Sequence, residues 1–506
     1  MLSNRLVMPK RATPFVKTLL AVRDFIGDLL CPSWRIMLIM VSSWALFTVV
    51  TITFPAPGVS AVWQSVESMG YTVLTAVCLW AATRAVKPAW LVRTWKVLPP
   101  LVRWRGWRAI FVMSLLVLTV NTTRGSIKDA VQGNYHTDAL AFVHIDADLL
   151  LHGRNPFTAD DAFWTAALRW PTAYATPIYG GKDFGKNPLH YPTNTFMGKI
   201  LEQQSLSSSL RNTSFDPQTV HNYPAGSILL ALPFVWAGLP SIIWMNLLFF
   251  IGIIALVIAR TPRRQQPAMT FALLLCPAFS EYGFFANIDI EALFFVLLAW
   301  HWLSHEKLSG LSLGFACAVK QLAWFFIPFY LLEVARREGL AVALRRLPWL
   351  VLGFLVPNLP FIIANPHAWL HSMLVPMTDS FFPLGFGLIQ LALVGLIPFG
   401  SERLWTVLTL GSWFTLLVYQ WRRLSVTADG LLFAVIPLWF SWRSLLNYFS
   451  LLPLFAAWLV AVYLQQQHAA RRDALLMQTT STTECDDEPT VALFPPRPID
   501  DAVPAL

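Results

Sequence analysis

Residues 241–259, SIIWMNLLFFIGIIALVIA, carry no charged side chain and are almost entirely apolar. A run of about 17–25 such residues is long enough for a helix to cross the hydrocarbon core of a bilayer. Comparable apolar runs lie near 36–54, 70–86, 109–122, 225–238, 268–282, 290–304, 310–332, 347–364, 384–399, 404–420, 430–442 and 446–464. The sequence therefore predicts an all-α polytopic membrane protein, a bundle of about 11–13 transmembrane helices.

The composition excludes a soluble protein. The chain has 506 residues, of which 56% are hydrophobic and only 13% are charged, and its mean hydropathy is +0.54. Soluble domains carry roughly a quarter charged residues. The net charge of +9 does not indicate nucleic acid, because the basic residues cluster at the ends of apolar runs, where they meet lipid headgroups. The five cysteines are scattered and predict neither a zinc site nor a disulfide framework.

The charge pattern divides the chain into four parts. Residues 1–35 form a basic lead-in, 36–108 hold two N-terminal spans and a basic interfacial segment, 109–465 hold the remaining apolar runs, and 466–506 read as a disordered cytosolic tail. The positive-inside rule puts the N-terminus in the cytosol, and we expect a cell membrane location. Two basic groups, at 260–264 and 422–423, do not fit this rule. They should be cytosolic, but if every apolar run crosses the membrane, they fall outside the cell.

Residues 123–224 form the one long polar stretch between apolar runs, and loops of this length are usually functional. This stretch is expected to lie outside the cell and to contain short amphipathic helices. The first covers residues 139–151, ends at Gly153 as a C-cap, and could lie flat on the membrane with its acids facing water or a cavity. Asp138 at its start is either a general base or simply the N-cap of the helix.

Six motifs stand in order along the chain: Asp138 with Phe142, GRNPF at 153–157, HNYP at 221–224, NIDIE at 287–291, AVKQ at 318–321 and SWRSLLNY at 441–448. Together they resemble the GT-C membrane glycosyltransferases, over residues 109–465. They are most similar to glycosyltransferase family 87 and related polyprenyl-phosphate-mannose-dependent mannosyltransferases. The chain departs from the simplest family pattern by its two extra N-terminal spans and by an insertion around 171–216.

The resemblance implies a GT-C-type fold with its active site at the outer membrane face. It also implies transfer of a sugar, with mannose as the first expectation, from a polyprenyl-phosphate donor to a hydroxyl of a glycolipid or glycan acceptor. No cofactor is expected, and the other partners are membrane lipids. Asp138 would be the base. The expected substrate-binding residues are Lys320, Arg443, Asp289, Glu291, Tyr223, His221, Arg154, Asn447 and Tyr448.

The residues themselves support parts of this expectation. Lys320 interrupts an apolar stretch with no acid nearby in sequence, so it needs an anion that a lipid phosphate would supply, unless it snorkels to the interface. Arg443 is a second candidate phosphate ligand. Asp289 and Glu291 either act directly or are wetted span-end residues, and Arg154 would fix the loop by pairing with an acid.

Three alternatives remain open from sequence. Asp146, Asp148 and His144 have helical spacing that can bind a metal, although no metal is the first expectation. For the whole chain, a secondary transporter is suggested by the number of spans and by their prolines, but the two halves look unlike. A lipid-carrier polymerase or ligase of another fold would share the location and the lipid substrate.

Overall fold

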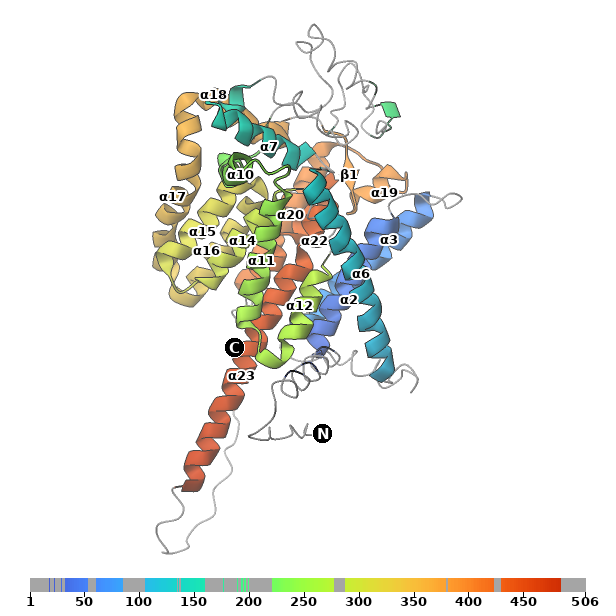
Figure 1. Ribbon diagram of the computed structural model, residues 1–506, viewed down its shortest axis with the longest axis vertical. Coiled ribbons are helices and arrows are strands. Elements are labelled where there is room, and N and C mark those ends of the chain that lie inside the picture. Colours follow the sequence, from blue (N-terminus) through green and yellow to red (C-terminus); the bar gives the residue numbers. More distant parts are fainter. Residues whose placement is uncertain are drawn as a thin grey trace, which may run out of the picture.

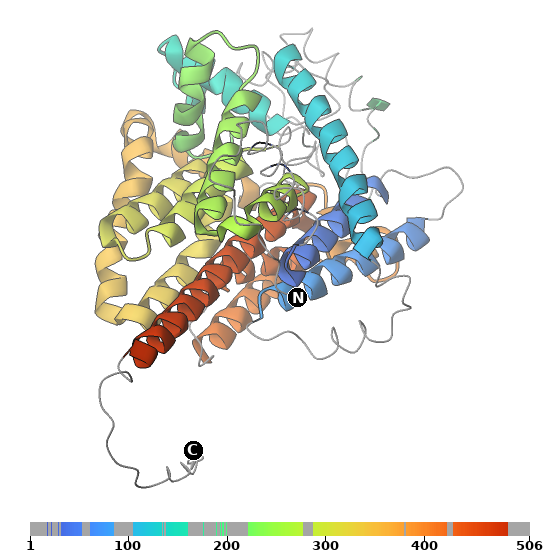
Figure 2. The same cartoon turned by 60° about the horizontal axis from the view of Figure 1, so that its bottom comes forward.

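The computed structural model describes residues 32–52, 61–84, 105–133, 138–159, 221–276, 287–378, 381–422 and 429–483, with a few single positions between them that include Tyr135 and Thr176. This part of the chain is a helical bundle, seen from two directions in Figures 1 and 2. The prediction of an all-α membrane protein is confirmed.

The first helices are α2 (Trp34–Ile52), α3 (Ala61–Ala82), α6 (Arg105–Gln132) and α7 (Asp138–Leu151), followed by the short 3-10 helix η1 (Pro156–Thr158). The middle of the chain forms α10 (Ala225–Trp236), α11 (Ile243–Arg260), η3 (Arg263–Gln265), α12 (Gln266–Leu274), α14 (Asp289–His301), α15 (Glu306–Val319), η5 (Gln321–Phe326), α16 (Ile327–Glu338) and α17 (Leu340–Ala364). The last elements are α18 (Pro366–Thr378), β1 (Leu384–Gly385), α19 (Ile389–Leu393), α20 (Glu402–Arg422), α21 (Gly430–Phe433), η6 (Ile436–Phe440), β2 (Arg443–Ser444), α22 (Leu446–Ser450) and α23 (Leu452–Thr483).

Three segments in the described ranges are long and apolar enough to cross a membrane: α11, α17 and residues 447–470 of α22 and α23. Large apolar side chains are exposed on α3, α17 and α20, among them Trp63, Ile363 and Phe414. Such surfaces are unusual in water and suit contact with lipid tails. The crossing helices therefore follow directly from the apolar runs of the sequence.

Several of the predicted spans are shorter or broken. The run 310–332 is divided at Lys320, whose extended backbone (φ −153°) ends α15, and Pro328 then opens α16. The run 384–399 is not a span, because it forms β1 and the five-residue α19. The run 430–442 is likewise divided into α21 and η6. Proline and buried polar groups interrupt the helical hydrogen bonds that a continuous span would need.

The strands β1 and β2 pair in parallel, with Leu384 opposite Arg443 and Gly385 opposite Ser444. Glycine is required at this contact, since a Cβ atom on Gly385 would lie 2.3 Å from the carbonyl oxygen of Ser444. The short ladder fixes the backbone on which Arg443 stands.

The helix ends that carry arginine gather at one end of the bundle, here called the basic end. The backbone N–H of Ser33 donates to Oε1 of Gln265 at 2.8 Å, and Arg260 donates to the carbonyl of His301 at 3.3 Å. Arg336 at the end of α16 donates to the carbonyl of Gln420 near the end of α20, at 2.6 Å. The start of α2 and the ends of α11, α14, α16 and α20 therefore lie on the same side.

This arrangement accounts for the two basic groups that did not fit the positive-inside rule. With twelve residues, α10 is too short to cross the bilayer, and α19 has only five. Removing α10 from the count puts the end of α11 on the same side as the start of α2. The end of α20 also comes to this side once α19 is removed and the run 310–332, divided at Lys320, is counted as two passages, α15 and η5 with α16. In Figure 1, α7 and α18 lie at the opposite end of the bundle.

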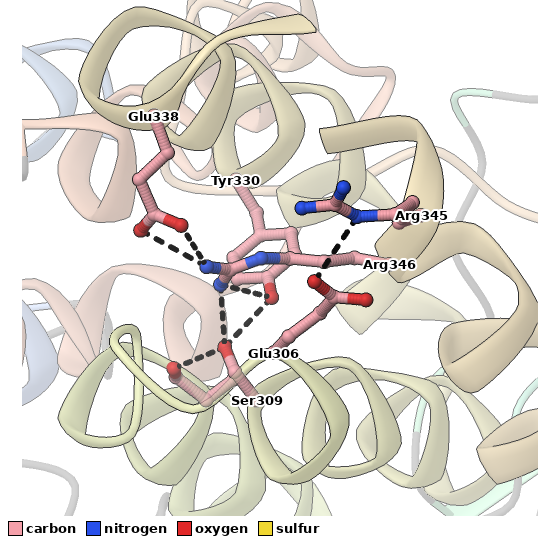
Figure 3. A network of polar contacts seen from close by, with 7 residues as sticks. Glu306, Ser309, Tyr330, Glu338, Arg345 and Arg346 are labelled. Carbon is pink, nitrogen blue, oxygen red and sulfur yellow. Dashed lines mark hydrogen bonds and ion pairs between the residues drawn. The ribbon is translucent and has the colours of Figure 1, made fainter. Parts of the chain in front are cut away.

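A buried polar network ties α15, α16 and α17 together at the basic end (Figure 3). Arg346 is fully buried and donates to both carboxylate oxygens of Glu338, at 3.0 and 2.8 Å, and to the hydroxyl of Tyr330 at 3.1 Å. The Tyr330 hydroxyl also lies 2.7 Å from Oγ of Ser309. The network fixes these three helices on the side away from α7.

The C-terminal tail differs from its prediction. Helix α23 continues to Thr483, so residues 466–483 are helical rather than disordered. The rest of the tail, residues 484–506, lies outside the described residues, as do most of the lead-in 1–35, the basic stretch 85–104 and most of the insertion 171–216.

Candidate functional site

Helix α7 begins at Asp138 and ends at Leu151, which confirms the predicted helix 139–151. Its C-terminal cap is also as predicted: Gly153 has φ +73°, and the backbone N–H groups of Gly153 and Arg154 donate to Leu150 and Leu149. The acids of this helix were expected to face water or a cavity. Most of α7 is buried, with Asp146 fully buried and Asp148 near the surface. The helix packs against α10, and the following η1 contacts α18 at the same end of the bundle (Figure 1).

Asp138 is held by a residue of the long loop. Its Oδ2 atom accepts hydrogen bonds from the backbone N–H and the hydroxyl of Thr176, at 2.9 and 2.7 Å. Burial raises the pKa of the Asp138 carboxyl, while the Thr176 hydrogen bonds and the charge of Arg443 oppose the rise. A carboxylate with a raised pKa is suited to accept a proton near neutral pH. Its contact to Thr176 shows that this carboxylate does more than cap α7.

Tyr223 stands among four other predicted site residues. Burial raises the pKa of its hydroxyl well above the usual value, and the charges of Asp138 and Asp289 raise it further. Tyr448 adds to the same effect, and Arg443 opposes it. These five side chains, which the sequence separates by up to 310 positions (448 minus 138), lie near enough to act on one another's ionisation.

Lys320 has its counter-ion within the chain. Its Nζ atom lies 2.5 Å from Oδ1 of Asp289 and donates to Oδ1 of Asn287 at 2.6 Å. The other carboxylate oxygen of Asp289 accepts from Nδ2 of Asn447 at 2.5 Å. Lys320, Asp289 and Asn447 are all buried. Lys320 was expected to need an anion that a lipid phosphate would supply, and Asp289, 31 positions earlier in the sequence, already pairs with it.

Lys320 also lies against Tyr223, with Nζ 5.6 Å from the ring centroid. The neighbouring Glu291 is fully buried, and neither of its carboxylate oxygens has a hydrogen-bond partner in the described part of the chain. The Lys320 charge acts on this carboxyl as well. Both acids of the NIDIE motif are thus buried beside Lys320 and are not wetted span-end residues.

Arg443 is the cation of the site whose charge is least compensated. Its guanidinium donates to the carbonyl of Phe382 at 3.0 Å and stacks over Phe381, with 4.9 Å to the ring centroid. Within the described ranges no carboxylate lies within ion-pair distance of it. The structure therefore leaves this guanidinium, half-buried beside Asp138 and Tyr223, able to bind a further anion.

His221 is turned away from this charged cluster. Its Nδ1 atom lies 2.5 Å from Oδ2 of Asp146 on α7, and its Nε2 atom lies 2.7 Å from the carbonyl oxygen of Tyr223. The sequence offered no sign of this pairing, since 75 positions separate the two residues (221 minus 146). His221 thus touches the backbone of the site rather than its charged side chains.

The three side chains suggested as metal ligands do not converge. His144 contacts the hydroxyl of Tyr135 at 2.5 Å, and Asp146 contacts His221. Asp148 lies near the surface beside the exposed His152. No group of three or more histidine, cysteine or acidic side chains in the described ranges is arranged to hold a metal ion. Arg154 is exposed, three positions after the end of α7.

Residues 221–434 match the family model of glycosyltransferase family 87. The match begins at His221 and includes Tyr223, Asp289, Glu291 and Lys320, so it supports the resemblance noted from the sequence. No curated protein and no solved structure matches the chain.

Proposed function

We propose that this chain, a membrane glycosyltransferase with a family 87 domain at residues 221–434, moves a sugar from a polyprenyl-phosphate carrier to an acceptor hydroxyl. Mannose is the proposed sugar, and a glycolipid or glycan is the proposed acceptor. One observation carries the proposal: the half-buried carboxylate of Asp138 lies close enough to the incompletely paired guanidinium of Arg443 for the two charges to interact. A proton acceptor and an anion-binding group side by side are what transfer from a phosphate-linked sugar requires.

In the proposed reaction, the oxygen of the acceptor hydroxyl attacks C1 of the sugar. Asp138 takes the proton of that hydroxyl, and the bond between C1 and the phosphate oxygen breaks with its electron pair on the phosphate. Arg443 stabilises the charge that develops on the leaving phosphate. Attack from the side opposite the phosphate inverts the configuration at C1.

Lys320 has a secondary role in this proposal. Because its ammonium group is already paired with Asp289, it adds positive potential to the phosphate site and does not bind the phosphate directly. Tyr223, against whose ring Lys320 lies, offers an apolar face to the sugar or to the first part of the lipid chain.

The proposed orientation follows from the basic end. Arginine-rich helix ends face the cytosol in most membrane proteins. The end that carries Asp138, Tyr223 and Arg443 would then face the outside of the cell, where a lipid-linked sugar is the available donor.

The test is sugar transfer by the purified protein in detergent, with polyprenyl-phosphate mannose, glucose and arabinose as radiolabelled donors and a membrane glycolipid fraction as acceptor. Asp138→Asn should lower transfer by at least about 10²-fold, the usual contribution of a placed base. Asp148→Asn is the matched control, because Asp148 lies on the same helix near the surface. Wild-type transfer by Asp138→Asn would disprove the assignment. Absence of transfer from every donor, with uptake of solute into sealed vesicles, would favour a transporter instead.

A further inference from the structure

His221 contacts an acceptor atom with each of its two ring nitrogens. Nε2 lies 2.7 Å from the carbonyl oxygen of Tyr223, which can only accept a hydrogen bond, so Nε2 carries a hydrogen. Nδ1 lies 2.5 Å from the Asp146 carboxylate. A neutral imidazole with its hydrogen on Nε2 would direct a lone pair from Nδ1 at a charged oxygen. That arrangement is repulsive, so the contact needs one more proton.

Burial gives the same answer. The side chains of Asp146 and His221 are 0% and 1% exposed. Apart from the short contact with His221, the Asp146 carboxylate has no polar partner in the described part of the chain. An ionised carboxylate that is buried without donors is costly. Burial accordingly raises the pKa of the Asp146 carboxyl, against the opposing charge of His221.

We infer that Asp146 and His221 share one proton, and that this protonated pair positions the segment His221–Ala225 in the donor site. The proton makes the pair neutral overall, whether it resides on the imidazole or on the carboxyl. Loss of the proton leaves the buried negative charge of Asp146 opposite a lone pair of His221, and the contact between α7 and His221 opens.

The segment is well placed to transmit such a change. Phe157 packs on the ring of His221 at 5.2 Å between centroids. Gln321, next to Lys320, donates to the carbonyl of Asn222 at 2.6 Å. The N–H of Ala225 donates to Asn358 of α17 at 3.0 Å. Of these three contacts and the Asp146–His221 pair, only the pair changes from attractive to repulsive when a single proton is lost.

In the described residues, the elements that carry the pair hold further titratable groups, among them the half-exposed Asp148 of α7. Asp138 and His144 lie on α7 with Asp146, Tyr223 is two positions from His221, and Lys320 lies over Tyr223. Asp138 governs the acid side of the proposed reaction, because it must be ionised to act. The shared proton is required on the alkaline side, so the two effects are separable in a pH profile.

The distinguishing variant is Asp146→Asn. An asparagine at this position donates from Nδ2 to Nδ1 of a neutral His221, while Nε2–H still donates to Tyr223, so the same geometry forms without the extra proton. We expect the variant to fold and transfer sugar at neutral pH. We also expect it to lose the alkaline decline of the wild type, which for a single proton is about tenfold per pH unit. The effect should fall on the KM for the donor more than on kcat, because the pair acts through the Tyr223 segment.

The control is Asp148→Asn, which alters the exposed Asp148–His152 pair on the same helix and should keep the wild-type profile. Proton NMR of histidine-labelled protein supplies a readout that does not depend on activity. The shared proton should give a strongly downfield resonance coupled to a ring nitrogen, absent from both His221→Gln and Asp146→Asn. An alkaline decline that survives in Asp146→Asn, or absence of the resonance from the wild type, would overturn the inference. The positioning role rests on the proposed function, whereas a protein that shows the resonance but transfers no sugar would refute the function and leave the protonated pair standing.

Discussion

The ammonium nitrogen of Lys320 lies 2.5 Å from a carboxylate oxygen of Asp289, and both side chains are buried in the bundle. The same carboxylate accepts from Asn447, so α14, the end of α15 and α22 meet at one acid. A buried pair of this kind contributes little net stability, but removing one partner leaves an uncompensated charge. The pair therefore makes the packing of these elements depend on both residues at once.

Lys320→Met should lower the free energy of unfolding by about 3–5 kcal/mol, because Asp289 is left buried without its cation. The double variant Lys320→Met with Asp289→Asn should recover most of that loss, since no charge remains buried. Thermal unfolding in detergent, followed by tryptophan fluorescence, measures both. A double variant less stable than Lys320→Met would show that Lys320 and Asp289 do not form an ion pair in the folded protein.

Arg443→Gln should lower kcat/KM for the lipid-linked donor by roughly 10–100-fold, because a hydrogen bond to a charged group contributes about 1.5–3 kcal/mol. The main change should be in KM, since the guanidinium binds the phosphate before and during transfer. Arg403→Gln is the matched control, as Arg403 is exposed at the start of α20. An equal loss in both variants would show that the effect is a general one of surface charge.

Asp138→Asn should be inactive yet at least as stable as the wild type at neutral pH. A carboxyl whose pKa is raised on folding stabilises the protein in its protonated form, and this contribution is lost as the pH rises through the raised pKa. The neutral asparagine avoids that loss. We expect the melting temperature of the variant to equal or exceed that of the wild type at pH 7, and the difference to shrink in acid. A variant that melts well below the wild type at pH 7 would argue that Asp138 is structural.

Thr176→Val tests the contact between the long loop and Asp138. The hydroxyl of Thr176 donates to the carboxylate at 2.7 Å, and this bond favours the ionised form. Loss of this bond should raise the pKa of Asp138. The acid limb of the pH–rate profile for sugar transfer should therefore shift to higher pH, by about one unit. Thr158→Val, which removes an exposed hydroxyl in η1, should leave the limb where it is. An unchanged limb in Thr176→Val would mean that the loop does not set the ionisation of Asp138.

The sequence predicted local features of the fold well. The helix of α7 and its glycine cap each depend on residues within a few positions of one another, and a single sequence carries that information. The predicted spans at 384–399 and 430–442 failed for the opposite reason. Their apolar composition satisfies the rule for a span. However, β1 pairs with β2 across 59 positions (443 minus 384), and a local sequence pattern cannot predict such a contact.

The site shows the same division. Asp138, Tyr223, Asp289, Lys320 and Arg443 were each suggested by a motif, and the structure brings them together. Which of them pair could not be predicted, because hydrogen bonds and ion pairs between distant segments are set by packing. For this reason the pairing of Lys320 with Asp289 was missed, as were the hydrogen bonds from Thr176 and the contact of His221 with Asp146.

The neighbours Arg345 and Arg346 provide a test of the network at the basic end (Figure 3). Each pairs with an acid, but the Arg345 side chain is 63% exposed and Arg346 is fully buried. Arg346→Ala should lower the free energy of unfolding by about 3–5 kcal/mol, because Glu338, Tyr330 and Ser309 lose their shared donor. Arg345→Ala should lower it by less than about 1 kcal/mol, as usual for an exposed pair. Chemical unfolding in mild detergent compares the two variants under one condition. Because the network lies away from Asp138, folded Arg346→Ala should keep the wild-type KM for the donor, and a large rise in KM would indicate that the basic end is coupled to the site.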